Sequence, residues 1–261
     1  MLLSTILVQA LLAAVGLALP SGKTRLDNRV TRRASGAHTF RTIASNSTHA
    51  SYSPSWSGVV LHAPAGTWRS VTGTFVVPAP KVPTGGSASG TYAASAWVGI
   101  DGDTCTTAIL QTGVDFYVES GTVSYDGWYE WYPDYAYDFA GLTFSAGDSV
   151  TLTVTALSKT SGTATITNNS KGKTVTKQIT STAALCEQDA EWIVESFDDG
   201  SSLVPVANFG TITFTNAYAT TNNGTIVYPS SGNPTLYDIE QSGKVLTSAS
   251  TSGSSVTVSY V

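Results

Sequence analysis

Carboxyl, amide and aromatic side chains are concentrated in four short segments of the sequence, residues 96–101, 109–115, 127–133 and 190–195. Because successive side chains of an extended strand point to opposite sides, alternate residues share a face. Alternation predicts four groups: Trp97 with Asp101; Gln111 with Asp115; Trp128 with Glu130 and Tyr132; and Glu191 with Ile193 and Glu195. A sheet face that displays these side chains together is typical of a binding cleft.

Histidine is too scarce for several common hydrolase mechanisms. The chain has three histidines, and two of them, His38 and His49, lie within the first 50 residues. A Ser-His or Cys-His nucleophile pair would have to use His62, and a zinc site with two histidines is impossible in the remainder. The sequence also lacks Asp-Thr-Gly and Asp-Ser-Gly, the local signature of a pepsin-like pair of catalytic aspartates. If the chain is a hydrolase, its acid and base are carboxyl groups.

The residues alone support these candidates unequally. A glutamine on a strand is more often part of the scaffold than a catalyst, so pattern alone favours a scaffold role for Gln111 over a catalytic one. Glu195 is favoured more, because the other face of its strand carries the apolar Ala190, Trp192 and Val194. The aromatic run 125–137 fits core packing as well as a substrate platform. Residues 99–103 resemble a calcium loop but lack further ligands at the expected spacing, so we predict no metal and no cofactor.

The first 50 residues differ in composition from the rest of the chain. Residues 1–18 form an apolar run that ends in small residues, which predicts a signal peptide rather than a membrane anchor. Residues 19–50 show no hydrophobic period and predict a propeptide. Residues 1–49 hold six basic side chains and one acidic, a net charge of +5, whereas the remainder holds seven basic and seventeen acidic, a net charge of −10. This contrast predicts electrostatic docking of the propeptide.

Residues 51–261 read as one all-β domain. Polar and apolar residues alternate in 149–155 and 211–215, and turn signals recur at 145–148, 161–162 and 223–224. No segment has four turns of helical periodicity, so the predicted architecture is a two-sheet antiparallel β-sandwich, with any helix short and peripheral. Cys105 and Cys186 are the only cysteines, and in an exported chain we expect them to be bonded to each other.

Four segments, 97–105, 108–113, 128–133 and 190–195, closely resemble the fungal glutamic peptidases, or eqolisins, and the similarity runs from about Trp56 to Val261. The resemblance implies a sandwich of the concanavalin A-like lectin/glucanase type with a cleft on its concave sheet. It implies that Gln111 and Glu195 are a catalytic dyad and that Cys105 and Cys186 form the family disulfide. It further implies the following cleft residues, which orient the dyad or bind substrate: Trp97, Asp101, Asp115, Glu130 and Tyr132.

These features together predict a secreted, monomeric endopeptidase that cleaves proteins in acid, is inhibited by its own propeptide, and binds neither nucleic acid nor, after processing, a membrane. The alternative is a β-sandwich glycoside hydrolase or glycan-binding module, because paired carboxyls such as Glu130 and Glu195 also suit sugars.

Ser196 follows Glu195 at a position where the family usually has Asp. Residues 80–86 run almost directly to Ala93, which predicts a single mature chain. Three glycosylation sequons begin at Asn46, Asn168 and Asn223.

Overall fold

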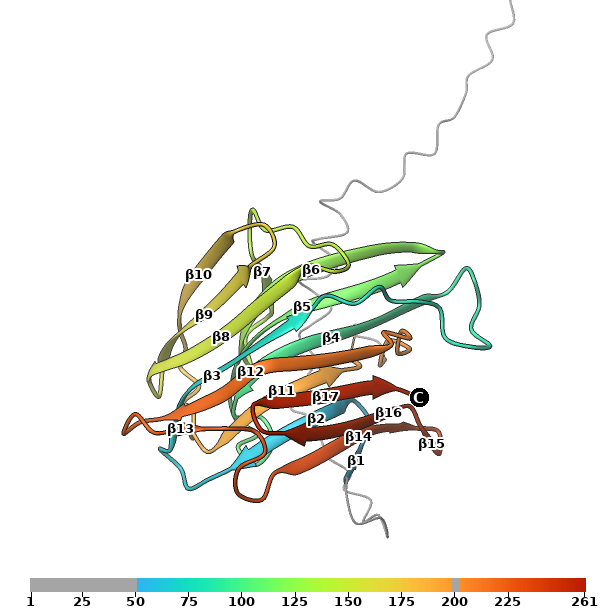
Figure 1. Cartoon of the computed structure of the whole chain (residues 1–261). Helices are drawn as coiled ribbons and strands as arrows, with labels where there is room; N and C mark the ends of the chain where they lie inside the picture. The colour runs from blue at the N-terminus through green and yellow to red at the C-terminus, as the bar shows by residue number, and fades with distance from the viewer. Residues whose placement is uncertain (1–50, 199–201) are drawn as a thin grey trace, which may run out of the picture.

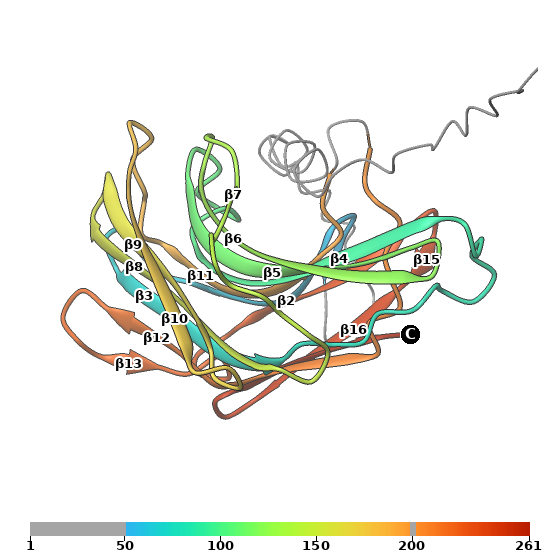
Figure 2. The same ribbon diagram turned by 90° about the horizontal axis from the view of Figure 1, so that it is seen from above.

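A computed structural model describes residues 51–198 and 202–261, and every regular element within them is a β-strand. The strands form two curved layers that lie one on the other (Figure 1). Seen from above, the layer that contains β4, β5 and β6 lies on the inner side of the curve (Figure 2). The predicted all-β sandwich is confirmed. The predicted signal peptide and propeptide lie outside the described residues.

The inner sheet supplies the face that carries the candidate site. Among the described residues its strands follow one another in this order: β1 (Ser51–Ser53), β14 (Thr235–Gln241), β2 (Trp56–His62), β11 (Asp189–Glu195), β4 (Thr91–Ile100), β5 (Ile109–Glu119), β6 (Thr122–Tyr132) and β7 (Tyr137–Asp138), with β15 (Lys244–Val245) beside β14. Strand β1 pairs with β14 in parallel, and the other pairs are antiparallel.

The outer sheet is antiparallel and backs the inner one. In the described part of the chain its order is β10 (Lys173–Thr180), β9 (Ser161–Asn168), β8 (Ser149–Ser158), β3 (Trp68–Val76), β12 (Thr211–Thr221), β17 (Ser255–Tyr260) and β16 (Thr247–Ser252), with β13 (Ile226–Val227) beside β12. The strands predicted at 149–155 and 211–215 lie within β8 and β12. The turn predicted at 161–162 is wrong by two residues, because residues 159–160 make the turn and Ser161 begins β9.

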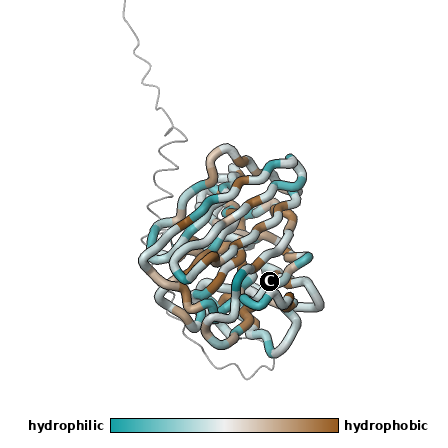
Figure 3. Tube along the Cα trace, turned by 90° about the vertical axis from the view of Figure 1, so that its left-hand side faces the viewer, coloured by the Kyte–Doolittle hydropathy of each residue, from teal (hydrophilic) through white to brown (hydrophobic). Residues whose placement is uncertain are grey.

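The hydrophobic core lies between the two sheets. Strand β8 alternates half-buried threonines and serine with fully buried Val150, Leu152 and Val154, as expected for a strand with one face on a core. Trp192 of β11 is fully buried, and its Nε1 donates a 2.8 Å hydrogen bond to the backbone oxygen of Thr72 in β3. Figure 3 shows apolar positions distributed along the strands and polar positions in several connecting loops. No described helix is long and apolar enough to cross a membrane.

Candidate active site

Strand register places the sequence-predicted residues in rows across the face of the inner sheet that points away from the core. The pairing of β11, β4, β5 and β6 gives three successive rows: Glu195, Ser95, Asp115 and Asp126; Ile193, Trp97, Gly113 and Trp128; and Glu191, Gly99, Gln111 and Glu130. Cross-strand neighbours point to the same side of a sheet. The two proposed dyad residues therefore share one face and lie on opposite sides of the Trp97 row.

Glu195 is the last residue of β11 and is held by an indole. Its side chain is buried, with 4% exposure, and Nε1 of Trp97 donates a 2.8 Å hydrogen bond to its Oε2. Trp56, which is opposite Glu195 on β2, packs edge-on against Trp97 with ring centroids 4.9 Å apart. This packing fixes the indole and, through it, the direction of the carboxyl group.

Gln111 lies in the middle of β5, directly opposite Glu130 of β6. Its Nε2 donates a 3.0 Å hydrogen bond to Oε2 of Glu130, and both side chains are buried. A carboxylate can only accept, so this contact identifies the nitrogen end of the amide and turns it toward Glu130. The amide oxygen of Gln111 is buried and has no hydrogen-bond partner among the described residues.

A glycine allows the two tryptophans of the middle row to pack closely. A Cβ at Gly113 would lie 2.6 Å from Cβ of Trp97 and 2.7 Å from Cζ2 of Trp128, far inside van der Waals contact. Nε1 of Trp128 also donates a 3.2 Å hydrogen bond to Oγ of Ser95. The result is an apolar floor between the rows that carry Glu195 and Gln111.

The remaining predicted cleft residues occupy the edges of this grid. Asp115 is buried in the row of Glu195 and accepts a 3.3 Å hydrogen bond from the hydroxyl of Tyr117. Tyr132 ends β6, lies opposite Ile109, and is half-buried against the apolar cluster of the same face. Both therefore border the face on which the dyad lies.

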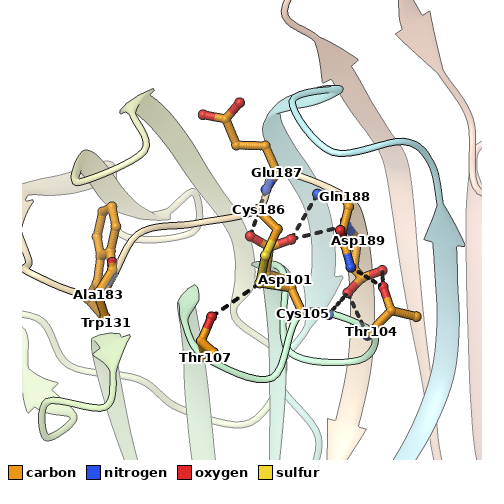
Figure 4. Close-up of a disulfide and its surroundings, with 10 residues drawn as sticks. All are labelled: Asp101, Thr104, Cys105, Thr107, Trp131, Ala183, Cys186, Glu187, Gln188 and Asp189. Carbon is orange, nitrogen blue, oxygen red and sulfur yellow. Dashed lines mark hydrogen bonds between the residues drawn. A yellow bond between two sulfur atoms is a disulfide. The ribbon is translucent and has the colours of Figure 1, made fainter.

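Asp101 lies just beyond the end of β4, outside the paired rows. It follows β4 with a φ of 67°, is fully buried, and accepts hydrogen bonds from the backbone N–H groups of Glu187, Gln188 and Asp189 at 2.8, 2.8 and 3.2 Å (Figure 4). Burial raises its pKa to about 6, although the three N–H groups oppose the shift. In this structure the carboxyl group anchors the backbone of residues 187–189.

The disulfide predicted from the sequence closes the same region. Cys105 and Cys186 are bonded, with their Cα atoms 6.0 Å apart, and they connect the segment after β4 to the segment before β11 (Figure 4). Asp189 adds a second connection by accepting hydrogen bonds from the backbone of Thr104 and Cys105 at 2.7 and 3.0 Å. Asp101 lies close to both sulfur atoms, but the sulfurs are bonded to each other and the carboxyl holds backbone N–H groups, so this cluster does not offer a metal site.

A polar cluster beside this loop was missed by the sequence reasoning. Nδ1 of His62 lies 3.0 Å from Oδ1 of Asp189, and Tyr237 donates a 2.9 Å hydrogen bond to Asp103. The hydrogen bond to Asp189 is the main reason that the pKa of His62 is raised. These residues are 127 and 134 positions apart in the chain, so no local pattern could have paired them.

Glu191 is a second residue for which the sequence predicted no role, although alternation placed it on the same face as Glu195. It is fully buried, and burial beside Asp189, Asp103 and Asp101 raises its pKa well above the usual value.

The three sequons differ in their surroundings. Asn168 is fully buried, and its Nδ2 donates hydrogen bonds to the backbone oxygen of Thr143 and to Asp148. Because Nδ2 is the atom that would carry a glycan, the prediction for Asn168 does not fit the folded chain. Asn223 is exposed and stays a prediction, and Asn46 lies outside the described residues.

Comparison with known proteins places this geometry in a family. Residues 54–260 match the Peptidase A4 family. Aspergillopepsin-2 from Aspergillus niger is 47% identical over 99% of both chains, and Scytalidopepsin B from Scytalidium lignicola is 38% identical over 95% of both. A crystal structure of scytalido-glutamic peptidase with a peptide-based transition-state analogue superposes with a TM-score of 0.70 at 39% identity, covering 80% of this chain and 98% of that chain. Since the family match and the two relatives span most of the sequence, the chain belongs to the Peptidase A4 family and is a glutamic peptidase.

Proposed function

We propose that Gln111 and Glu195 are the catalytic dyad of a secreted endopeptidase that works in acid. The observation that carries this proposal is the strand register, which places a carboxyl group and an amide on one sheet face, on either side of the Trp97–Gly113 floor. A peptide that lies across this floor would have Glu195 on one side of its scissile bond and Gln111 on the other.

Each dyad residue has a chemical role that its surroundings support. Glu195 as a carboxylate takes a proton from water, the hydroxide attacks the scissile carbonyl, and the same proton passes to the departing amine as the tetrahedral intermediate collapses. Gln111 donates an N–H of Nε2 to the oxyanion, while its contact with Glu130 keeps that nitrogen in place. The amide does not titrate.

The residues that we propose to bind substrate lie on the same sheet face as the dyad. Trp97, Glu130 and Tyr132 line the rows beside the dyad, and Asp115 continues the row of Glu195. The solved relative carries a peptide-based transition-state analogue, which supports an extended peptide as the ligand class. The glycoside hydrolase alternative has no such support, because the relatives compared above are named as peptidases.

The dyad is tested by replacing the residue whose role depends most on the resemblance. Gln111→Ala should lower the rate of cleavage of a defined peptide at acid pH by roughly 100- to 1,000-fold, the usual effect of losing one oxyanion donor. Gln178→Ala, at an exposed position on β10, is the matched control and should keep the parental rate. Parental activity of folded Gln111→Ala, with an aspartic-peptidase inhibitor present, would refute the dyad.

The proposal for maturation rests on the difference in net charge between the two parts of the chain. The predicted propeptide, residues 19–50, belongs to a cationic lead segment of +5, and the rest of the chain carries −10. Attraction between them would weaken as acid neutralises carboxylates, which would release an inhibitory segment where the enzyme works. A synthetic peptide of residues 19–50 should inhibit the mature enzyme near neutral pH and lose potency in acid. Equal inhibition at both pH values, or none, would contradict electrostatic docking.

A further inference from the structure

Two buried polar groups on the catalytic face lack partners, and they lie in the same row. Both carboxyl oxygens of Glu191 and the amide oxygen of Gln111 are buried without a hydrogen-bond partner among the described residues. Buried polar atoms are almost always paired with protein or with ordered water, and leaving one unpaired costs about 1–3 kcal/mol. Two such groups in one row indicate a common partner.

Gly99 brings the two groups toward each other. It pairs with Glu191 on one side and with Gln111 on the other. A Cβ at Gly99 would lie 2.8 Å from Cζ3 of Trp97 and 3.0 Å from Oε2 of Glu191, so the edge of the indole and the carboxyl group both extend over the glycine. Directly opposite residues in a sheet have Cβ atoms about 5 Å apart, which places the side chain of Gln111 just beyond. Gly99 itself contributes no side chain between them.

We propose that Glu191 is a positioning residue for Gln111: its carboxyl group donates, through one buried water, to the amide oxygen of Gln111. Nε2 is held by Glu130 on the opposite side. With both ends of the amide held, Nε2 stays directed toward the oxyanion, and the amide cannot turn over. The inference rests on the proposed role of Gln111 as oxyanion donor.

The surroundings of Glu191 supply the donor that this link needs. Only a protonated carboxyl can donate a hydrogen bond. Burial, followed by the negative charges of Asp189, Asp103 and Asp101, raises the pKa of Glu191 well above its usual range, so the group is protonated in acid. The backbone N–H of Asp103 acts in the opposite direction but does not meet hydrogen-bond geometry with either oxygen.

The test separates positioning from stability. Glu191→Met keeps the volume but removes the donor, and kcat should fall about 10- to 100-fold with KM within about threefold, as for a misplaced catalytic group. Its Tm should stay close to that of the parent, because relief from burying a carboxyl group offsets the loss of its water-mediated contact. Glu191→Gln keeps a donor, so the kcat of this variant should stay within about threefold of that of the parent. If Glu191→Met does not fold, Glu191→Leu takes its place with the same expected result.

A double-mutant cycle with Gln111→Ala connects the effect to its target. If Glu191 acts through Gln111, then Glu191→Met should have no further effect on kcat in the Gln111→Ala background. Independent, multiplicative losses would overturn the inference. Parental kcat in Glu191→Met beside an impaired Gln111→Ala would overturn the positioning role alone. Parental kcat in Gln111→Ala would overturn the proposed function and this role with it.

Discussion

Each side chain of the proposed dyad is oriented by a partner from a neighbouring strand. Trp97 donates to Glu195 over 2.8 Å, and Gln111 donates to Glu130 over 3.0 Å. Both contacts form between buried groups, where water does not compete and hydrogen bonds are electrostatically stronger. A catalytic group that is held before substrate arrives does not have to reorganise during the reaction. Chemistry at this site therefore depends on residues that do not themselves react.

Removal of the indole donor tests that dependence. Trp97→Phe keeps the ring in the apolar floor but loses the hydrogen bond to Glu195, and a hydrogen bond to a charged group is worth about 1.5–3 kcal/mol. We expect kcat to fall about 10- to 100-fold. Trp131→Phe is the control, because Nε1 of Trp131 donates a similar 2.9 Å bond to Ala183 on the core side of the same sheet. Equal kcat in the two variants would contradict the role of Trp97.

At the scale of the strand, the site depends on how closely neighbouring side chains can pack. Gly113 lies between Trp97 and Trp128 in the middle row, and the two tryptophans occupy the space that a Cβ would need. The floor and the dyad rows beside it are therefore fixed together. A change in this row should displace Glu195 and Gln111 without contacting either.

Gly113→Ala should destabilise the fold by about 1–3 kcal/mol, the usual cost of overpacking, and should also lower kcat. Gly121→Ala, in the turn between β5 and β6, is a useful control because its Cβ would meet nothing within 4 Å, although its φ of 76° still carries strain. Differential scanning calorimetry and peptide cleavage on both variants check this. A loss of kcat in Gly121→Ala as large as in Gly113→Ala would contradict a local effect of the floor.

Alternation predicted the faces of β5, β6 and β11 correctly, because those strands continue through the residues concerned. The period of two does not extend to Asp101, because β4 ends at Ile100 and the positive φ of Asp101 turns the chain. Alternation could not find the contact between Trp97 and Glu195, which are 98 residues apart and meet only when β4 pairs with β11. Long-range register is a property of the assembled sheet and leaves no local pattern.

Across the whole molecule, several buried carboxyl groups make the folded state more stable in acid. Burial raises the pKa values of Asp101 and Asp238 to about 6, whereas an unfolded Asp titrates near 3.8. The folded chain holds these protons where the unfolded chain has released them, so the contribution to stability is complete below about pH 4 and is lost as pH rises through 6. The lowered pKa of Asp189 acts oppositely, since its contribution is lost as pH falls below about 4. Stability should therefore decline from acid toward neutral pH.

Asp238→Asn tests this at a position on β14 outside the rows of the dyad. The amide oxygen can still accept from the backbone N–H of Ala249, which donates to Asp238 over 2.6 Å, but the side chain no longer titrates. We expect Tm to fall less steeply between pH 4 and pH 6 in this variant than in the parent, with kcat at acid pH unchanged. Parallel Tm profiles in the two proteins would show that Asp238 does not contribute to the pH dependence.

The most direct test of the proposed mechanism is the cleavage rate of a defined peptide by Glu195→Gln at acid pH, with an aspartic-peptidase inhibitor present and folding checked by circular dichroism. A general acid–base group contributes about 100- to 10,000-fold, so the rate should fall by that factor. Glu119→Gln, at the exposed end of β5, should retain the parental rate. A folded Glu195→Gln that cleaves the peptide as fast as the parent would contradict the assignment of Glu195 as the acid–base residue.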